Sequence, residues 1–259
     1  MTNSEDPSSD ALGGRGRLLL QIRLAVSFLT IIPIPIKYAD ESDVAASMAW
    51  FPLVGLAMGV AFASEDYVLA FLFGHALRSA LIVLSMAILS GALHLDGLAD
   101  TADALGAGRD RNRALEILRD SRIGTYGAIA IFFALGLKVL SLAALSGRPR
   151  LAVLILAPML ARWALVAVSY KIDYLRSSGA GSSMLGSVDA RNLAIASAII
   201  LVAMLPFLSW QTFGMYATAI PTAFILRKFY RRWLGGITGD LIGACVEIIE
   251  VLALLTIAS

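Results

Sequence analysis

Cysteine and histidine are almost absent from this sequence of 259 residues. Cys245 is the one thiol, so no intramolecular disulfide can form, and redox chemistry that needs a cysteine pair is excluded. Two histidines, His75 and His94, argue against a zinc site built on imidazole ligands. The sequence also lacks a Walker-type glycine–lysine loop and a GxSxG elbow, which removes two common classes of catalytic motif.

Charge is scarce as well. Charged residues make up 15% of the chain and apolar residues 58%, whereas a soluble domain has about 25% and about 45–50%. The net charge of +2 is too small to indicate nucleic acid or another polyanion as a partner. A disordered chain is excluded by the same composition. What remains is a polytopic membrane protein with one integral domain.

Eight apolar runs follow one another along the chain without the alternation typical of strands, so the sequence predicts an all-α helical bundle in lipid. They cover residues 18–36, 45–73, 79–93, 124–145, 151–170, 193–212, 214–226 and 240–258. We expect about seven spans, because Pro33 and Pro35 break the first run into a re-entrant or partial helix. Residues 1–17, rich in Ser, Asp and Gly, are predicted to be a disordered cytoplasmic tail.

Two arginine-rich stretches predict the orientation in the membrane. Residues 94–123 contain Arg109, Arg111, Arg113, Arg119 and Arg122. Residues 227–239 contain Arg227, Lys228, Arg231 and Arg232. By the positive-inside rule both stretches face the cytoplasm, and we expect the tail and residues 37–44 on the same side. Arg148 and Arg150 then lie outside, which is a mild cost to this scheme.

The stretch GALHLDGLADTADAL carries three carboxylates at helical spacing. Asp96, Asp100 and Asp103 fall within about 60° of each other on a helix, where like charges repel and are costly to desolvate. A divalent cation removes both costs. Carboxylates with one adjacent His94 suit Mg²⁺ or Mn²⁺ better than zinc, and Gly97 lets a phosphate or the backbone approach closely. The alternative is a solvated acidic helix end.

The stretch ILRDSRIGTYGAI places two arginines three residues apart. Arg119 and Arg122 are therefore neighbours on a helical turn, and two guanidinium groups can bind phosphate oxygens bidentately. Ser121, Gly124 and Thr125 lie at the start of the next predicted span. The alternative is a basic cluster that contacts anionic lipid and sets topology, which we favour for the three arginines upstream.

The stretch RKFYRRWLGGITGDLIGACVEIIE combines a basic turn with a glycine-rich helix start. Backbone amides of such a start form an anion cradle. The residues of this cradle are Gly235, Gly236, Thr238 and Gly239. Asp240 is either a catalytic carboxylate or the N-cap of the helix.

Ionisable residues also occur inside the predicted spans. Glu247 lies seven residues after Asp240 and shares its helix face, and Glu250 follows one turn later. Lys138 lies in another span. Ionisable residues at such depth are candidates for a functional site. Lys138 either belongs to that site or forms a salt bridge to one of the two glutamates.

In combination these motifs resemble the cobalamin synthase family, adenosylcobinamide-GDP ribazoletransferase. The motifs are FLTIIPIP at 28–35, FPLVGLAMG at 51–59, HLDGLADTADAL at 94–105, ILRDSRIGTYG at 117–127 and LGGITGDLIGACVEIIE at 234–250. Their order is specific, and the resemblance covers nearly the whole chain after the tail. Residues 18–259 would then form one integral membrane catalytic domain.

The resemblance implies a multi-pass transferase of the bacterial inner membrane that acts in the nucleotide-loop pathway of cobalamin (vitamin B12) biosynthesis. Such an enzyme transfers cobinamide phosphate from adenosylcobinamide-GDP to α-ribazole or its 5′-phosphate. The products are adenosylcobalamin, or its 5′-phosphate, and GMP, and Mg²⁺ is required. The active site would face the cytoplasm. A homo-oligomer and a complex with other enzymes of the corrinoid pathway both stay open.

Roles in this chemistry can be assigned to the residues above. We expect three metal ligands: Asp96, Asp100 and Asp103. The metal would bridge pyrophosphate oxygens, while Arg119 and Arg122 offset the developing charge. Asp240 would bind a second metal or accept the hydroxyl proton. The residues predicted to contact substrate are His94, Gly97, Ser121, Gly124, Thr125, Lys138, Gly235, Gly236, Thr238, Gly239 and Glu247.

Two other functions stay open. The segment DGLAD is similar to the DGxxAR motif of CDP-alcohol phosphotransferases, but Asp100 stands where their arginine would be and no GxxxDxxxD follows. A divalent-cation transporter would use Asp96, Asp100, Glu247 and Glu250 as pathway ligands. The arginine–glycine stretches suit phosphate better than a cation. Metal uptake into sealed vesicles, compared with GMP release in detergent, separates these classes.

Overall fold

Helices account for the regular structure of the described chain, apart from one isolated parallel bridge between Tyr174 and Ile237. The structure is a computed structural model that describes residues 14–36, 38–106, 108, 110–120, 122–176 and 188–259. The predicted all-α class is therefore confirmed. The helices are α1 (Gly14–Leu29), α2 (Glu41–Ser47), η2 (Met48–Trp50), α3 (Phe51–Leu69), α4 (His75–Leu89), α5 (Leu93–Gly106), α6 (Arg111–Ile117), α7 (Thr125–Ala144), α8 (Gly147–Ser169), α10 (Ala190–Met204), η3 (Leu205–Phe207), α11 (Trp210–Trp233) and α12 (Gly239–Ala258).

Five helical segments of the described chain are long and apolar enough to cross a membrane. They are Glu41–Leu69, Thr125–Ala144, Gly147–Ser169, Ala190–Phe207 and Gly239–Ala258. A sixth results if α4 and α5, which meet at a bend of 87°, form one broken span. The polytopic membrane bundle is confirmed, with fewer candidate spans than the seven expected. α1, with 16 residues, is shorter than a span and ends before Pro33, as the partial first helix requires.

Element boundaries differ from the prediction at several places, two of which lie in charged segments. α1 begins at Gly14, so residues 14–17 are helical although their composition assigns them to the tail; residues 1–13 lie outside the described chain. The basic residues 227–232, which follow the predicted apolar run 214–226 and are expected to form a turn, continue α11 to Trp233. Arg and Lys are good helix formers, and their charge is favourable at the negative end of the helix dipole.

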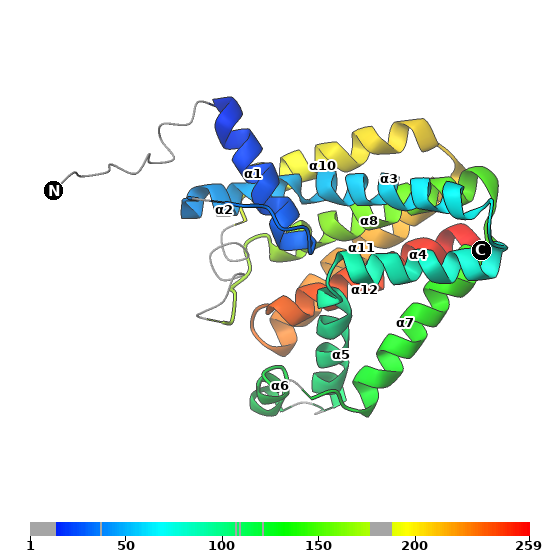
Figure 1. Cartoon of the computed structure of the whole chain (residues 1–259). Helices are drawn as coiled ribbons and strands as arrows, with labels where there is room; N and C mark the ends of the chain where they lie inside the picture. The colour runs from blue at the N-terminus through cyan, green and yellow to red at the C-terminus, as the bar shows by residue number, and fades with distance from the viewer. Residues whose placement is uncertain (1–13, 37, 107, 109, 121, 177–187) are drawn as a thin grey trace.

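α8 is the central helix of the bundle. It packs against α3, α10, α11 and α12, and Figure 1 shows α3 and α10 alongside it. A Cβ on Gly55 of α3 would lie 2.6 Å from the carbonyl oxygen of Pro158, and one on Gly59 would lie 2.4 Å from that of Ile155. The hydrophobic effect does not drive helices together within lipid. Close van der Waals packing through small residues therefore stabilises helix pairs such as α3 and α8.

The bend between α4 and α5 brings the acidic stretch to α12. Gly91 (φ 60°) and Ala92 (φ 56°) both adopt the left-handed conformation at this point, which costs glycine little. α5 then turns away from α4, with α6 beside its far end (Figure 1). Contacts between α5 and α12 are extensive, so the carboxylates of α5 lie near the glycine-rich start of α12.

The arginines expected on the outer side are engaged with other groups. Arg150 is 2% exposed, and its guanidinium donates to Asp66 at 2.5 Å and to the Ser79 hydroxyl at 3.0 Å. Arg78 also contacts Asp66, at 3.0 Å. Arg148 donates to the carbonyl oxygen of Pro206 at 2.8 Å. Because Arg150 is buried and paired with a carboxylate, it adds little positive charge to that face of the protein.

Candidate active site

One pocket brings the acidic, arginine-rich and glycine-rich stretches together. Its volume is about 340 Å³. The lining residues are Asp96, Asp100, Leu118, Arg119, Asp120, Arg176 and Asp240. They come from α5, the turn after α6, the segment after α8 and the first turn of α12. Four segments of the chain therefore contribute to one site.

Gly97 sets the distance between α5 and α12. A Cβ at this position would lie 2.7 Å from the carbonyl oxygen of Asp240 and 3.0 Å from its Cα. The absence of a side chain lets the two helices approach closely enough for both to line the pocket. Of the two roles predicted for Gly97, the structure shows the close approach of backbone.

Gly97→Ala is expected to destabilise the protein by about 1–3 kcal/mol, since the added methyl group overlaps the α12 backbone. Turnover should fall with it, because α12 must move and take Asp240 along. Thermal unfolding in detergent and an activity assay measure both effects. Gly136→Ala on α7 is the matched control, because its Cβ would meet nothing within 4 Å. Equal losses in the two variants would contradict a specific role for the α5–α12 contact.

Asp103 has a different environment from the other two carboxylates of α5. Its oxygens accept hydrogen bonds from the backbone N–H groups of Gly124, at 2.7 Å, and Gly127, at 2.9 Å. A Cβ on either glycine would lie 2.4 Å from this carboxylate. Asp103 therefore caps the start of α7, whose first amides have no partner within the helix. The structure does not bring Asp103 into the pocket, where Asp96 and Asp100 lie with Asp240 instead.

The two arginines of the RDSR segment are also separated. Arg119 lines the pocket. The side chain of Arg122 is 86% exposed and donates to Asp120 at 2.6 Å, and this hydrogen bonding lowers the pKa of the Asp120 carboxyl to about 2. Thr125 begins α7 and does not line the pocket. Ser121 lies outside the described residues.

The start of α12 is capped by Thr238. Its hydroxyl oxygen accepts the N–H of Leu241 at 3.4 Å, and the hydroxyl donates to the Asp240 carboxylate at 3.1 Å. Asp240 lies in the first turn of the helix. Because Thr238 fills the N-cap position, the alternative in which Asp240 is only the cap is wrong.

The glycines before α12 allow a second segment to approach. Gly235 has a φ of 83°, and a Cβ on Gly236 would lie 2.4 Å from the carbonyl oxygen of Asp173. Gly239 donates its N–H to the Tyr174 hydroxyl, and burial raises the pKa of Tyr174. Gly236 and Gly239 thus let the segment before Arg176 lie against the start of α12. Their role as an anion cradle stays a prediction.

Arg176 lines the pocket but lies outside every motif that the sequence analysis singled out. Its Nη2 donates to Oδ2 of Asp240 and to the carbonyl oxygen of Leu118, both at 2.6 Å. Ile237 fixes the preceding segment, 173–175, through two backbone hydrogen bonds of 2.8 and 2.9 Å. In the sequence Arg176 is a single arginine before a Ser- and Gly-rich stretch. No local motif marks it, and only this long-range pairing places it beside Asp240.

Lys138 and Glu247 lie in the interior of the bundle. The ammonium of Lys138 is 2.7 Å from Glu247 and 2.5 Å from Glu250, and Arg162 also donates to Glu250. These four side chains are at most 5% exposed. The salt-bridge interpretation of Lys138 is therefore confirmed. His94 is buried and interacts electrostatically with Arg162 and Glu250. None of the three predicted contacts Lys138, Glu247 and His94 lines the pocket.

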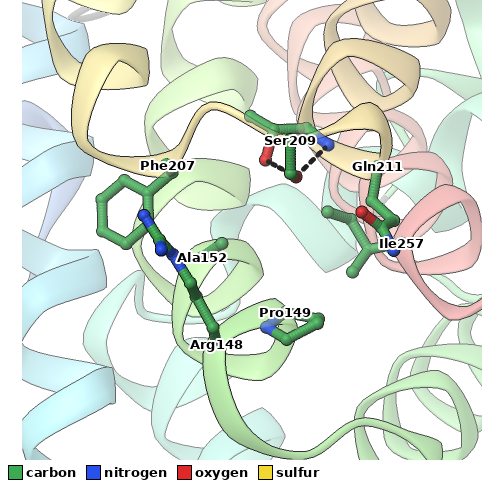
Figure 2. Close-up of a pocket in the computed structure, with 8 residues that line it drawn as sticks. Arg148, Pro149, Ala152, Phe207, Ser209, Gln211 and Ile257 are labelled. Atoms are coloured by element: carbon green, nitrogen blue, oxygen red, sulfur yellow. Dashed lines mark hydrogen bonds between the residues drawn. The ribbon is translucent and has the colours of Figure 1, made fainter.

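A second pocket lies at the opposite end of α12. Its volume is about 170 Å³. Figure 2 shows Arg148 and Phe207 close together on one side, with Ser209, Gln211 and Ile257 across the opening. Its described lining contains no carboxylate. It therefore offers no anionic ligand for a divalent cation, and the acidic pocket is the better candidate for metal-dependent chemistry.

The acidic pocket has the donor chemistry for Mg²⁺ without an assembled set of ligands. Its carboxylates are the hard oxygen donors that this ion prefers. Within the described chain, no three His, Cys, Asp or Glu residues are grouped closely enough to hold a metal ion. Asp240 is engaged by Arg176, and Asp120 by Arg122. The residues fit a divalent cation in type and charge, and Oδ2 of Asp240 becomes available to a cation only when Arg176 releases it.

Comparison with known proteins identifies the family. The model of the cobalamin-5-phosphate synthase family, CobS, matches residues 21–258. The chain belongs to the CobS family. A CobS relative from Syntrophobacter fumaroxidans, named adenosylcobinamide-GDP ribazoletransferase, is 39% identical over 236 residues, which cover 89% of this chain and 94% of the relative.

Further CobS relatives carry the same name. One from Geotalea daltonii is 36% identical and covers 91% of this chain and 96% of its own length. One from Escherichia coli is also 36% identical, over 90% of this chain and 96% of its own. No solved structure matches. The resemblance expected from the motifs is therefore confirmed, and the CobS match includes every segment that lines the acidic pocket.

Proposed function

We propose that this chain catalyses the reaction of its family in the acidic pocket. Its activity is that of an adenosylcobinamide-GDP ribazoletransferase of cobalamin biosynthesis, as the family match and the named relatives support. One observation carries the location of the active site. Asp96 and Asp100 of α5, Arg119 after α6 and Asp240 of α12 converge on a single pocket, although they belong to different sequence motifs.

The reaction is a phosphoryl transfer. A hydroxyl of α-ribazole, or of its 5′-phosphate, attacks the phosphorus bound to cobinamide. The bond from that phosphorus to GMP breaks, GMP leaves, and the hydroxyl proton passes to a carboxylate of the pocket. Such a transfer depends mainly on positioning and on neutralising charge. The corrinoid product is adenosylcobalamin or its 5′-phosphate.

We assign metal binding, phosphate binding and positioning to different residues of the pocket. Asp96, Asp100 and Asp240 would hold Mg²⁺, whose charge offsets that of the pyrophosphate oxygens. Arg119 donates hydrogen bonds to the phosphate oxygens that become more negative as the bond to GMP breaks. Thr238 orients Asp240 through its hydroxyl. Asp103 keeps α7 against α5 and so supports the pocket from outside.

We place the protein in the bacterial inner membrane with this pocket on the cytoplasmic side. The turn after α6 lines the pocket, and Arg111 of α6 donates to the carbonyl oxygen of Leu234, which directly follows the basic end of α11. By the positive-inside rule these elements stay in the cytoplasm. Apart from its small-molecule substrates, the proposal requires the lipid bilayer as the partner of this protein.

Arg119→Lys is expected to lower kcat/KM by about 10- to 150-fold, the equivalent of one hydrogen bond to a charged group. Lysine keeps the charge but loses the two-pronged geometry. Arg122→Lys should cost much less, because Arg122 faces solvent and pairs with Asp120. The assay is GMP release from adenosylcobinamide-GDP and α-ribazole by purified protein.

Arg113→Lys is the matched control for both variants, since Arg113 is an exposed arginine of the same region that pairs with Glu116 at 2.7 Å. It should retain full activity. Equal losses in Arg119→Lys and Arg122→Lys would show that the pocket is not where phosphate binds. Absence of GMP release by the unaltered protein would refute the activity itself.

A further inference from the structure

Arg176 contacts two walls of the acidic pocket and belongs to a third. Its Nη2 binds the Asp240 carboxylate on α12 and the Leu118 carbonyl at the end of α6, and Ile237 holds the segment before it. Its side chain is 35% exposed. The guanidinium is therefore within reach of a ligand in the pocket while it holds Asp240.

The charge of the pocket opposes the substrate that the proposed function assigns to it. Two guanidinium groups line it, Arg119 and Arg176. Four carboxylates face them: Asp96, Asp100, Asp120 and Asp240. A pyrophosphate group is itself anionic, so an acidic pocket repels it unless a cation is present or a guanidinium is released from its carboxylate.

We infer that Arg176 is a phosphate-binding residue that Asp240 holds in place until a cation and the pyrophosphate bind. The inference rests on the proposed function, because it takes the pyrophosphate of the substrate to bind in this pocket. A cation at Asp240 replaces the guanidinium as partner of the carboxylate. The guanidinium then turns to the phosphate oxygens, which it can bind bidentately.

This exchange leaves neither group of the ion pair without an opposite charge. Asp240 passes from Arg176 to the cation, and Arg176 passes from Asp240 to phosphate. An arginine or a carboxylate left alone in a part-buried position would be costly, whereas an exchange of partners is not. Cation and pyrophosphate therefore strengthen each other's binding, and this coupling is reciprocal.

The inference predicts opposite effects on GDP affinity for two substitutions, one at Arg176 and one at Asp240. GDP binding is measured by calorimetry on the full-length protein in detergent, with EDTA present so that no metal contributes. Arg176→Gln should weaken GDP binding by about 2-fold or more in EDTA, where Asp240 still competes for the guanidinium, and by about 10-fold or more when Mg²⁺ replaces EDTA. Asp240→Asn should strengthen GDP binding by about 2- to 5-fold, because the competing ion pair is removed.

Two further variants complete the experiment. Arg113→Gln is the matched control, since it removes an exposed arginine paired with Glu116, and it should leave GDP binding unchanged. Arg176→Lys keeps the positive charge, and the lysine ammonium can still donate a hydrogen bond to Asp240. This variant should therefore fold even if Arg176→Gln does not. Its GDP binding should still be weaker than that of the unaltered protein, because lysine cannot bind two phosphate oxygens side by side.

A role for Arg176 in holding the walls together predicts a different result. Either substitution would then break the same Arg176–Asp240 ion pair, so both Arg176→Gln and Asp240→Asn would weaken GDP binding. That outcome, or unchanged binding in Asp240→Asn, would overturn the inference.

Arg119→Gln separates failure of the inference from failure of the proposed function. If Arg119→Gln weakens GDP binding and Arg176→Gln does not, the pocket binds phosphate and only the role of Arg176 is wrong. If neither substitution weakens it, GDP binds elsewhere, and the proposed location of the active site is wrong together with the inference.

Discussion

Asp96→Asn and Asp100→Asn should each lower turnover by more than about 100-fold, since loss of even an outer-shell partner of a metal site costs about 10- to 100-fold. Both carboxylates line the pocket. In the part of the chain that the structure describes, neither forms a hydrogen bond or an ion pair, so the substitutions remove no contact that stabilises the fold. The variants should insert and purify normally. GMP release at limiting Mg²⁺ measures the effect.

Asp189→Asn provides the matched control for these variants. Asp189 caps α10 by accepting the N–H of Asn192 at 2.8 Å, and it does not line the pocket. Asparagine caps a helix about as well as aspartate, so this variant should keep full activity. Full activity of Asp96→Asn or Asp100→Asn at limiting Mg²⁺ would contradict their assignment as metal ligands.

Lys138→Met should destabilise the protein by about 3–5 kcal/mol, because it leaves two buried glutamates with Arg162 as their remaining cation. The double variant Lys138→Met with Glu247→Met should recover most of this loss. It removes one charge of each sign and fills the space with apolar side chains, which is often neutral for stability. Unfolding by a denaturing detergent measures the free energies.

Lys228→Met on α11 is the control for that pair, because Lys228 is exposed. Its substitution should change stability by no more than about 0.5 kcal/mol. A double variant as unstable as Lys138→Met alone would mean that the lysine and Glu247 do not stabilise each other.

Helix class and the acidic face could be predicted from the sequence because both depend on local spacing. Long apolar runs require helices in lipid, and a separation of four residues places Asp96 and Asp100 on one face. The number of spans was less predictable. The left-handed conformation at Gly91 and Ala92 turns one apolar run away from its neighbour, and no pattern of hydropathy specifies that bend.

The interpretation of Asp103 shows where local spacing is insufficient. Its helical position matches that of Asp96 and Asp100, yet its carboxylate binds amides 21 and 24 residues further along the chain. The start of α7 is itself a site for an anion, and Asp103 occupies it. Spacing within one helix gives no information about the amides of another.

Arg176 and Lys138 illustrate two kinds of long-range information. Lys138 was singled out because any charge inside an apolar span requires a partner, and the glutamates of α12 were the available ones. Arg176 lies in a polar segment, where an arginine is ordinary. Its partner Asp240 lies 64 residues later, and only the backbone pairing with Ile237 brings the two together.

The interior contacts of α12 fix its depth relative to its neighbours. Glu247 and Glu250 are held by Lys138 of α7 and Arg162 of α8, while Gly97 rests against the first turn of the helix. A change in bilayer thickness acts on helices that can tilt or slide. Sliding α12 along α5 would separate these charges and force backbone atoms together, so a thinner or thicker bilayer can tilt the bundle only as a unit. The position of Asp240 is therefore set by the protein and not by the lipid around it.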